Sequence, residues 1–60
     1  MLNDYIRLKE GHSLWLFDTF DMAANENEDL VVRAISERSA REIALKVLRN
    51  HQILSVTRIY

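Results

Sequence analysis

The sequence predicts a single α+β domain over residues 1–60, in which one helix packs on a three- or four-stranded antiparallel or mixed sheet. Residues 13–17 and 30–35 are rich in the apolar and β-branched side chains typical of strands. Between residues 36 and 50 the apolar side chains recur at helical spacing, and a last apolar segment occupies residues 53–60. The expected order is β-β-α-β, or β-β-β-α-β if the N-terminal segment also pairs.

The N-terminal segment has two possible structures. The dipeptide Gly11-His12 fits a two-residue type II′ turn, because glycine suits the first central position. This turn would pair residues 6–10 with residues 13–17 in a hairpin, with Glu10 opposite Ser13 and Ile6 opposite Phe17. Alternatively, Asn3 caps a short helix that ends at Gly11. The pattern favours the hairpin and leaves both structures open.

The segment LWLF, residues 14–17, has large apolar side chains on both faces of the predicted strand. Alternation places Trp15 and Phe17 on one face and Leu14 and Leu16 on the other. One helix covers one face, and we expect it to cover the aromatic pair, which has the larger area to bury. Leu14 and Leu16 are therefore predicted self-association residues, in a homodimer. The alternative is that the N-terminal segment folds back over them.

Polar residues accumulate in DTFDMAANENED, residues 18–29, and predict a loop. Its carboxylates could in principle bind a cation, but the segment lacks the ligand pattern of a twelve-residue calcium loop. They are Asp18, Asp21, Glu26, Glu28 and Asp29. We therefore expect solvated carboxylates, with no metal site and no cofactor. Asp18 or Asp21 could cap the turn by accepting hydrogen bonds from its own backbone.

The segment LVVRAI, residues 30–35, predicts a strand, and Ser36 is a suitable N-cap for the helix that follows. Glu37 lies in the first turn, where a negative charge suits the helix dipole, and the helix should extend to about Asn50. Glu37 and Arg41 have the favourable i,i+4 orientation of an ion pair. The side chains expected to pack on the sheet are Ala40, Ile43, Ala44 and Val47, with Leu48 at the edge.

The succession of LWLF, DTFDMA, LVVRAIS, SERSAR and SVTRI, over roughly residues 13–59, resembles a group of short bacteriophage proteins with a β-β-α-β pattern. Most of these have no assigned function, so the resemblance supplies no catalytic residue. Small phage inhibitors such as anti-CRISPR proteins have a similar size and architecture. By this analogy the chain is a phage-type accessory protein that binds, and inhibits or modulates, a host protein or another phage protein.

The outer face of the predicted helix carries the candidate partner-binding residues Arg38, Arg41, Leu45 and Arg49. Arginine forms bidentate contacts with carboxylates, and an apolar residue among arginines can anchor an interface. An acidic protein surface would fit this face. The alternative is nucleic-acid binding through the arginines and Lys46, although a net charge of -1 predicts weak binding to phosphates.

Composition and motifs exclude several classes of function. No apolar run approaches the length of a membrane span and no signal peptide begins the chain, so we expect a cytoplasmic location and no membrane partner. A single glycine excludes the usual phosphate-binding loops, and the absence of cysteine excludes disulfides. His12 and His51 are expected at exposed positions, outside any recognised catalytic spacing. We therefore do not expect an enzyme.

Overall fold

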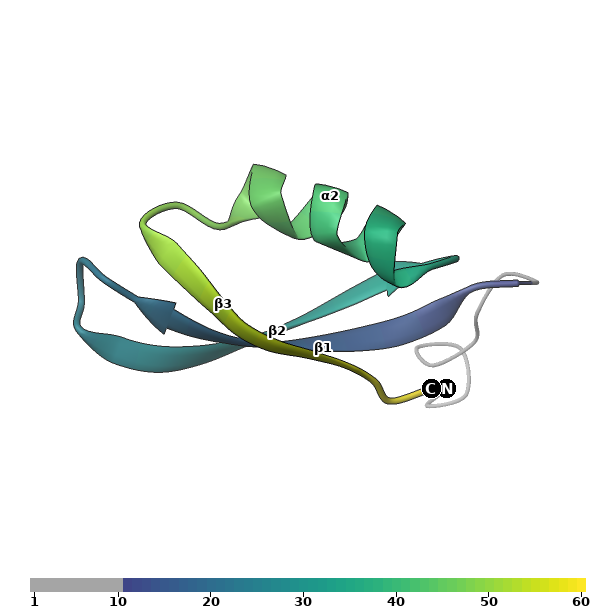
Figure 1. Ribbon diagram of the computed structural model, residues 1–60, viewed down its shortest axis with the longest axis horizontal. Helices are drawn as coiled ribbons and strands as arrows, with labels where there is room; N and C mark the ends of the chain where they lie inside the picture. The colour runs from purple at the N-terminus through teal and green to yellow at the C-terminus, as the bar shows by residue number, and fades with distance from the viewer. Residues whose placement is uncertain (1–10) are drawn as a thin grey trace, which may run out of the picture.

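The computed structural model describes residues 11–60, which form a β-β-α-β unit (Figure 1). Strands β1 (Ser13–Asp21) and β2 (Glu26–Ala34) form an antiparallel hairpin, helix α2 (Glu37–Val47) follows, and strand β3 (His51–Arg58) closes the sheet. The sheet order is β2-β1-β3, and both outer strands run antiparallel to β1. The predicted α+β fold is confirmed, with three strands in the described residues.

The prediction of a loop over residues 18–29 is wrong. Strand β1 continues to Asp21 and β2 begins at Glu26, so only residues 22–25 form the turn. Thr19 is fully buried, and its hydroxyl donates a 2.7 Å hydrogen bond to the backbone carbonyl of Glu28. A buried polar side chain is tolerated where its hydrogen bonds are made. Pairing with β2 therefore stabilises the end of β1 as a strand, although the polar residues in this segment favour a loop.

The turn itself is capped as the sequence suggested. The carboxylate of Asp21 accepts hydrogen bonds from the backbone N–H groups of Ala23 and Ala24, at 2.9 and 3.1 Å. Asn25 has a φ of 59°, in the left-handed region that asparagine tolerates better than most residues. These interactions fix the register of the β1–β2 hairpin.

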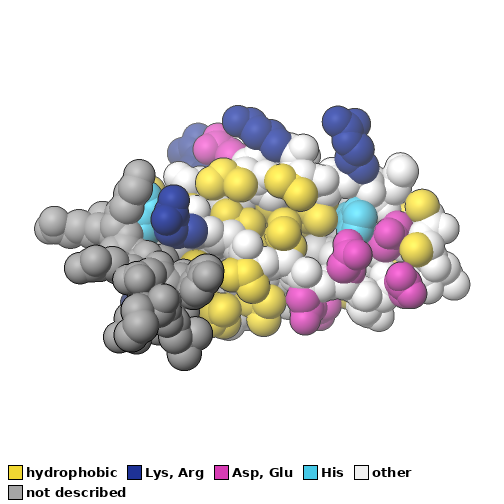
Figure 2. Space-filling model, turned by 180° about the vertical axis from the view of Figure 1, so that it is seen from behind, with side chains coloured by type: hydrophobic (Ala, Val, Ile, Leu, Met, Phe, Trp, Pro, Cys, Tyr) yellow, Lys and Arg dark blue, Asp and Glu magenta, His cyan; other side chains and the backbone are white. Residues whose placement is uncertain are grey.

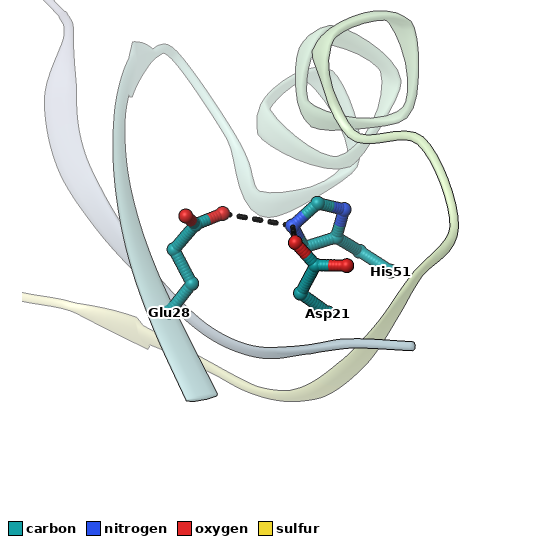
Figure 3. Close-up of side chains that lie close together, drawn as sticks. All are labelled: Asp21, Glu28 and His51. Carbon is teal, nitrogen blue, oxygen red and sulfur yellow. Dashed lines mark hydrogen bonds and ion pairs between the residues drawn. The ribbon is translucent and has the colours of Figure 1, made fainter. Parts of the chain in front are cut away.

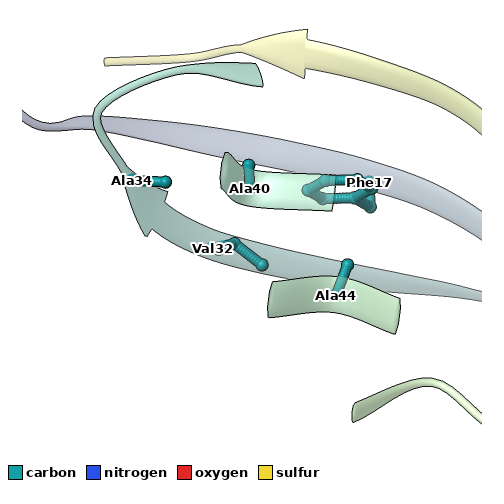
Figure 4. Close-up of a cluster of buried hydrophobic side chains, with 5 residues drawn as sticks. All are labelled: Phe17, Val32, Ala34, Ala40 and Ala44. Atoms are coloured by element: carbon teal, nitrogen blue, oxygen red, sulfur yellow. The ribbon is translucent and has the colours of Figure 1, made fainter. Parts of the chain in front are cut away.

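The core lies between α2 and the face of the sheet that carries Phe17 (Figure 4). Phe17 is fully buried, and Trp15 is half-buried against the core with its indole N–H donating to the carbonyl of Ala34 at 3.1 Å. Both aromatic residues face the helix, as predicted. The helix contributes the fully buried side chains of Ala40 and Ala44, whose small size lets it lie close to the strands.

The helix begins as the sequence predicts and ends earlier. The hydroxyl of Ser36 accepts a 3.1 Å hydrogen bond from the N–H of Ser39, which confirms the N-cap. The helix ends at Val47 instead of near Asn50, because Leu48 turns to extended backbone and packs against the core. Asn50 then adopts a φ of 58°, and β3 begins one residue later. The strand predicted over residues 53–60 is therefore shifted: β3 begins two residues earlier, at His51, and ends at Arg58, so Ile59 and Tyr60 fall outside it.

Two residues predicted to pack on the sheet are largely exposed. Ile43 is 41% exposed and Val47 is 61% exposed, whereas Ala40 and Ala44 are buried as expected. The helix packs mainly against β2, so only a narrow strip of its surface touches the sheet. Apolar side chains consequently gather on the molecular surface beneath the helix (Figure 2).

Helix α2 is shorter than the strands that it covers. At 1.5 Å per residue its 11 residues span about 16 Å, whereas a nine-residue strand spans about 30 Å. The turn end of the hairpin therefore extends beyond the helix (Figure 1). Within the described residues, no helix is long and apolar enough to cross a membrane.

The predicted pairing of residues 6–10 with residues 13–17, and the alternative helix capped by Asn3, depend on residues 1–10 and so lie outside the described residues. Gly11 lies inside them and has a φ of 81°. Both structures need a positive φ at this position, so the glycine does not distinguish them.

Phe17→Ala should lower the free energy of unfolding by about 3 to 5 kcal/mol, because it opens a cavity at the centre of a small core. Urea unfolding followed by circular dichroism measures the change. Phe20→Ala is the matched control, since Phe20 is only half-buried and lies on the opposite face of β1. Equal losses in the two variants would contradict the assigned core.

Candidate functional site

The four residues of the predicted partner-binding face lie at exposed positions on or just beyond α2. Leu45 is 66% exposed, and Arg38, Arg41 and Arg49 are exposed as well. The guanidinium of Arg41 donates a 3.0 Å hydrogen bond to the carboxylate of Glu37, which confirms the predicted i,i+4 pair. Such an exposed pair contributes only about 0.2 to 0.5 kcal/mol, so Arg41 can exchange it for a partner's carboxylate at little cost.

The face of the sheet that points away from α2 is a second candidate surface, here called the open face. Leu14 and Leu16 lie on it, as predicted, and both are half-buried. Their partners on β2 are Arg33, opposite Leu14, and Val31, opposite Leu16. Val31 is 50% exposed. The described elements provide no helix on this side, so the open face has an apolar centre at Leu16 and Val31.

Charges lie on either side of the apolar centre of the open face. Arg33 lies toward one end, and Asp18 and Asp29 lie directly opposite each other on the other side of Leu16 and Val31, before Phe20 and Asn27. Like charges at opposed positions of an antiparallel pair are unfavourable. Within residues 11–60, no ion pair joins any of these three side chains to another residue. The open face therefore runs from a cation, across apolar side chains, to two carboxylates.

A third feature is a cluster of Asp21, Glu28 and His51 on the helix-bearing face, beyond the end of the helix (Figure 3). Asp21 ends β1, Glu28 lies in β2, and His51 begins β3. The Nε2 atom of His51 lies 2.8 Å from Oε1 of Glu28 and 3.7 Å from Oδ2 of Asp21. The three strands thus bring together side chains that are distant in the sequence.

The hydrogen bonds of His51 indicate its protonation state. Its Nδ1 bonds to the backbone carbonyl of Arg49 and its Nε2 to the carboxylate of Glu28, and both partners are acceptors. Only the protonated ring can donate to both acceptors at once, so this arrangement favours the imidazolium form. The Glu28 carboxylate, followed by the Arg49 carbonyl, raises the pKa of His51 above its usual value, and the negative charge of Asp21 adds to the shift.

Asp21 is held in its ionised form by the turn. The backbone N–H of Ala24 is the largest influence that lowers the pKa of Asp21, followed by the N–H of Ala23 and the nearby charge of His51. Burial acts in the opposite direction. The same carboxylate therefore caps the turn through Oδ1 and faces His51 through Oδ2.

Sequence reasoning missed this cluster, although it named the residues separately. His12 and His51 were expected to be exposed, but both are half-buried, and the side chain of His51 is only 11% exposed. The period-two pattern extended from Phe17 through Thr19 would have placed Asp21 on the helix-bearing face. The predicted loop over residues 18–29 removed that signal.

No protein-family model, curated protein or solved structure matches this chain.

The raised pKa of His51 makes stability depend on pH. Its contribution is complete below the usual histidine pKa of 6.5 and is lost as the pH rises through the higher pKa of the folded protein. The free energy of unfolding, measured by urea titration across this range, should fall toward alkaline pH. His51→Gln should flatten the profile, and Glu28→Gln, which removes the largest cause of the raised pKa of His51, should reduce the fall. A wild-type profile that is flat across this range would contradict the assignment.

Proposed function

We propose that this chain is a small protein-binding domain that works as a homodimer and acts as a phage-type accessory protein, modulating another protein in the cytoplasm of a host cell. The open face carries the proposal. Its central residues, Leu16 and Val31, are apolar, and the single described helix lies on the other side of the sheet. Apolar sheet faces of this kind are stabilised by burial against a second surface.

The charge pattern favours a second copy of the chain as the occupant of the open face. In a two-fold interface the same patch serves both subunits, so each residue meets a symmetry-related position. If the two-fold axis runs along the Leu16 and Val31 pair, perpendicular to the strands, the strands of the two sheets point in opposite directions. Arg33 of each copy then faces Asp18 and Asp29 of the other. The repulsion between the two carboxylates is then offset. The opposite orientation would place like charges together, so the pattern selects one arrangement.

Dimerisation through the open face leaves the outer face of α2 accessible, because the helix covers the other side of the sheet. Each dimer would present two copies of the surface formed by Arg38, Arg41, Leu45 and Arg49. An acidic protein surface matches the arginines, and the exposed Leu45 side chain supplies an apolar anchor. Two linked copies also increase the avidity for a partner with repeated binding sites.

Leu16→Lys should raise the dimer dissociation constant by about thirtyfold or more, since a charge at the interface centre costs at least about 2 kcal/mol. Sedimentation equilibrium measures this constant. Arg33→Asp should raise it by about fivefold, and adding Asp29→Arg to the same chain should restore it. Arg58→Asp is the matched control, because Arg58 pairs with Trp15 and so belongs to the other face. A wild-type chain that stays monomeric at every concentration would refute the dimer.

Leu45→Glu should abolish capture of an acidic partner protein from host lysate by the immobilised chain. Val47→Glu is the control, because Val47 is similarly exposed on the same helix but lies away from the arginines. Affinity for DNA or RNA that falls steeply with salt, and weakens on Arg38→Ala, would instead support the nucleic-acid alternative. Equal capture by both glutamate variants would place the partner surface elsewhere.

A further inference from the structure

The cluster of Asp21, Glu28 and His51 has the dimensions of a metal site. It offers one imidazole nitrogen and two carboxylate oxygens, and these atoms all lie within 4.8 Å of one another. Ligands bound at about 2 Å to a tetrahedral ion lie about 3.3 Å apart. The distances from Nε2 of His51 to the Glu28 and Asp21 oxygens, 2.8 and 3.7 Å, lie on either side of that value. Small side-chain movements would therefore admit an ion.

A group outside the cluster orients the histidine. The backbone carbonyl of Arg49 accepts a hydrogen bond from Nδ1, which directs Nε2 toward the two carboxylates. Histidines that bind metals generally donate their second ring N–H to a carbonyl or carboxylate, and this bond fixes the ring and its tautomer. Asn50, between the carbonyl and the histidine, has a left-handed backbone with a φ of 58°. The supporting contact of a metal ligand is thus already present.

The donor set and its charge select the class of ion. Two carboxylates and a neutral imidazole carry a charge of about -2, which a divalent cation neutralises. Imidazole with carboxylate ligands suits Zn²⁺ and neighbouring transition metals, whereas Mg²⁺ and Ca²⁺ take oxygen ligands. We propose that Asp21, Glu28 and His51 bind a divalent transition-metal ion of the Zn²⁺ type.

The position of the site gives the ion a structural role. Each ligand comes from a different strand, so the ion links β1, β2 and β3 where the sheet extends beyond the helix. The ligands meet only in the folded sheet, so binding stabilises the fold by mass action. The side chain of Glu28 is 56% exposed, which leaves coordination positions for water or a partner's side chain. On binding, Nε2 gives its proton to solvent and its lone pair to the ion.

Zinc binding by the untagged full chain tests the proposal. Isothermal titration with ZnCl₂ should show one ion per chain, and ZnCl₂ should raise the melting temperature while MgCl₂ does not. Glu28→Gln and His51→Gln should each weaken the affinity by about 100-fold or more, since even supporting residues of metal sites contribute 10- to 100-fold. Glu42→Gln, at an exposed position on α2, and His12→Gln are matched controls and should change the affinity by less than about threefold, because neither residue belongs to the cluster. Circular dichroism verifies that each variant is folded.

Three results would overturn the metal site: wild-type affinity weaker than about 1 mM, equal affinity in the Glu28→Gln variant and its control, or loss of binding in His12→Gln alone. If His51→Gln fails to fold, the Glu28→Gln comparison still decides, because Glu28 is the most exposed ligand. The zinc titration is repeated with the Leu16→Lys variant, which weakens the proposed dimer, to separate metal binding from dimerisation. The metal site and the dimer lie on opposite faces, so either can fail without the other.

Discussion

Within residues 11–60, one helix of 11 residues covers a sheet whose central strand carries apolar side chains on both faces. The helix does so around Phe17, which is fully buried beneath it, and it approaches closely because Ala40 and Ala44 are small. One short helix cannot cover a second face or the full length of the strands. The open face and the uncovered end of the sheet both result from this constraint.

On the helix-bearing face of β1, the side chains become more polar toward the end of the strand that the helix does not cover. Phe17 lies under the helix, Thr19 is buried but hydrogen-bonded, and Asp21 lies beyond the helix at the turn. Partly buried charges are stabilised by pairing, and at the end of the strand the His51 ring lies beside the carboxylates of Asp21 and Glu28. Charged side chains therefore occur on this face where the helix no longer covers the sheet.

The open face is also not covered by α2, but it has a different arrangement of side chains. It retains an apolar centre at Leu16 and Val31 and has its charges on either side of that centre, with Arg33 separated from Asp18 and Asp29. Within one chain this arrangement leaves the carboxylates facing each other. In a two-fold pair it becomes complementary, which is the physical basis of the proposed dimer. The two faces of one sheet would thus serve separate purposes, metal binding on one and assembly on the other.

Local sequence determined the order of the elements, the Ser36 cap and the opposite faces of Phe17 and Leu16, because capping and strand alternation act over a few residues. Tertiary structure decided where the strands end, since Thr19 joins a strand through a hydrogen bond to a residue nine positions away. It alone brought His51 to the carboxylates, because β3 pairs with β1 after the helix crosses the sheet. Long-range strand pairing leaves no local signal in the sequence.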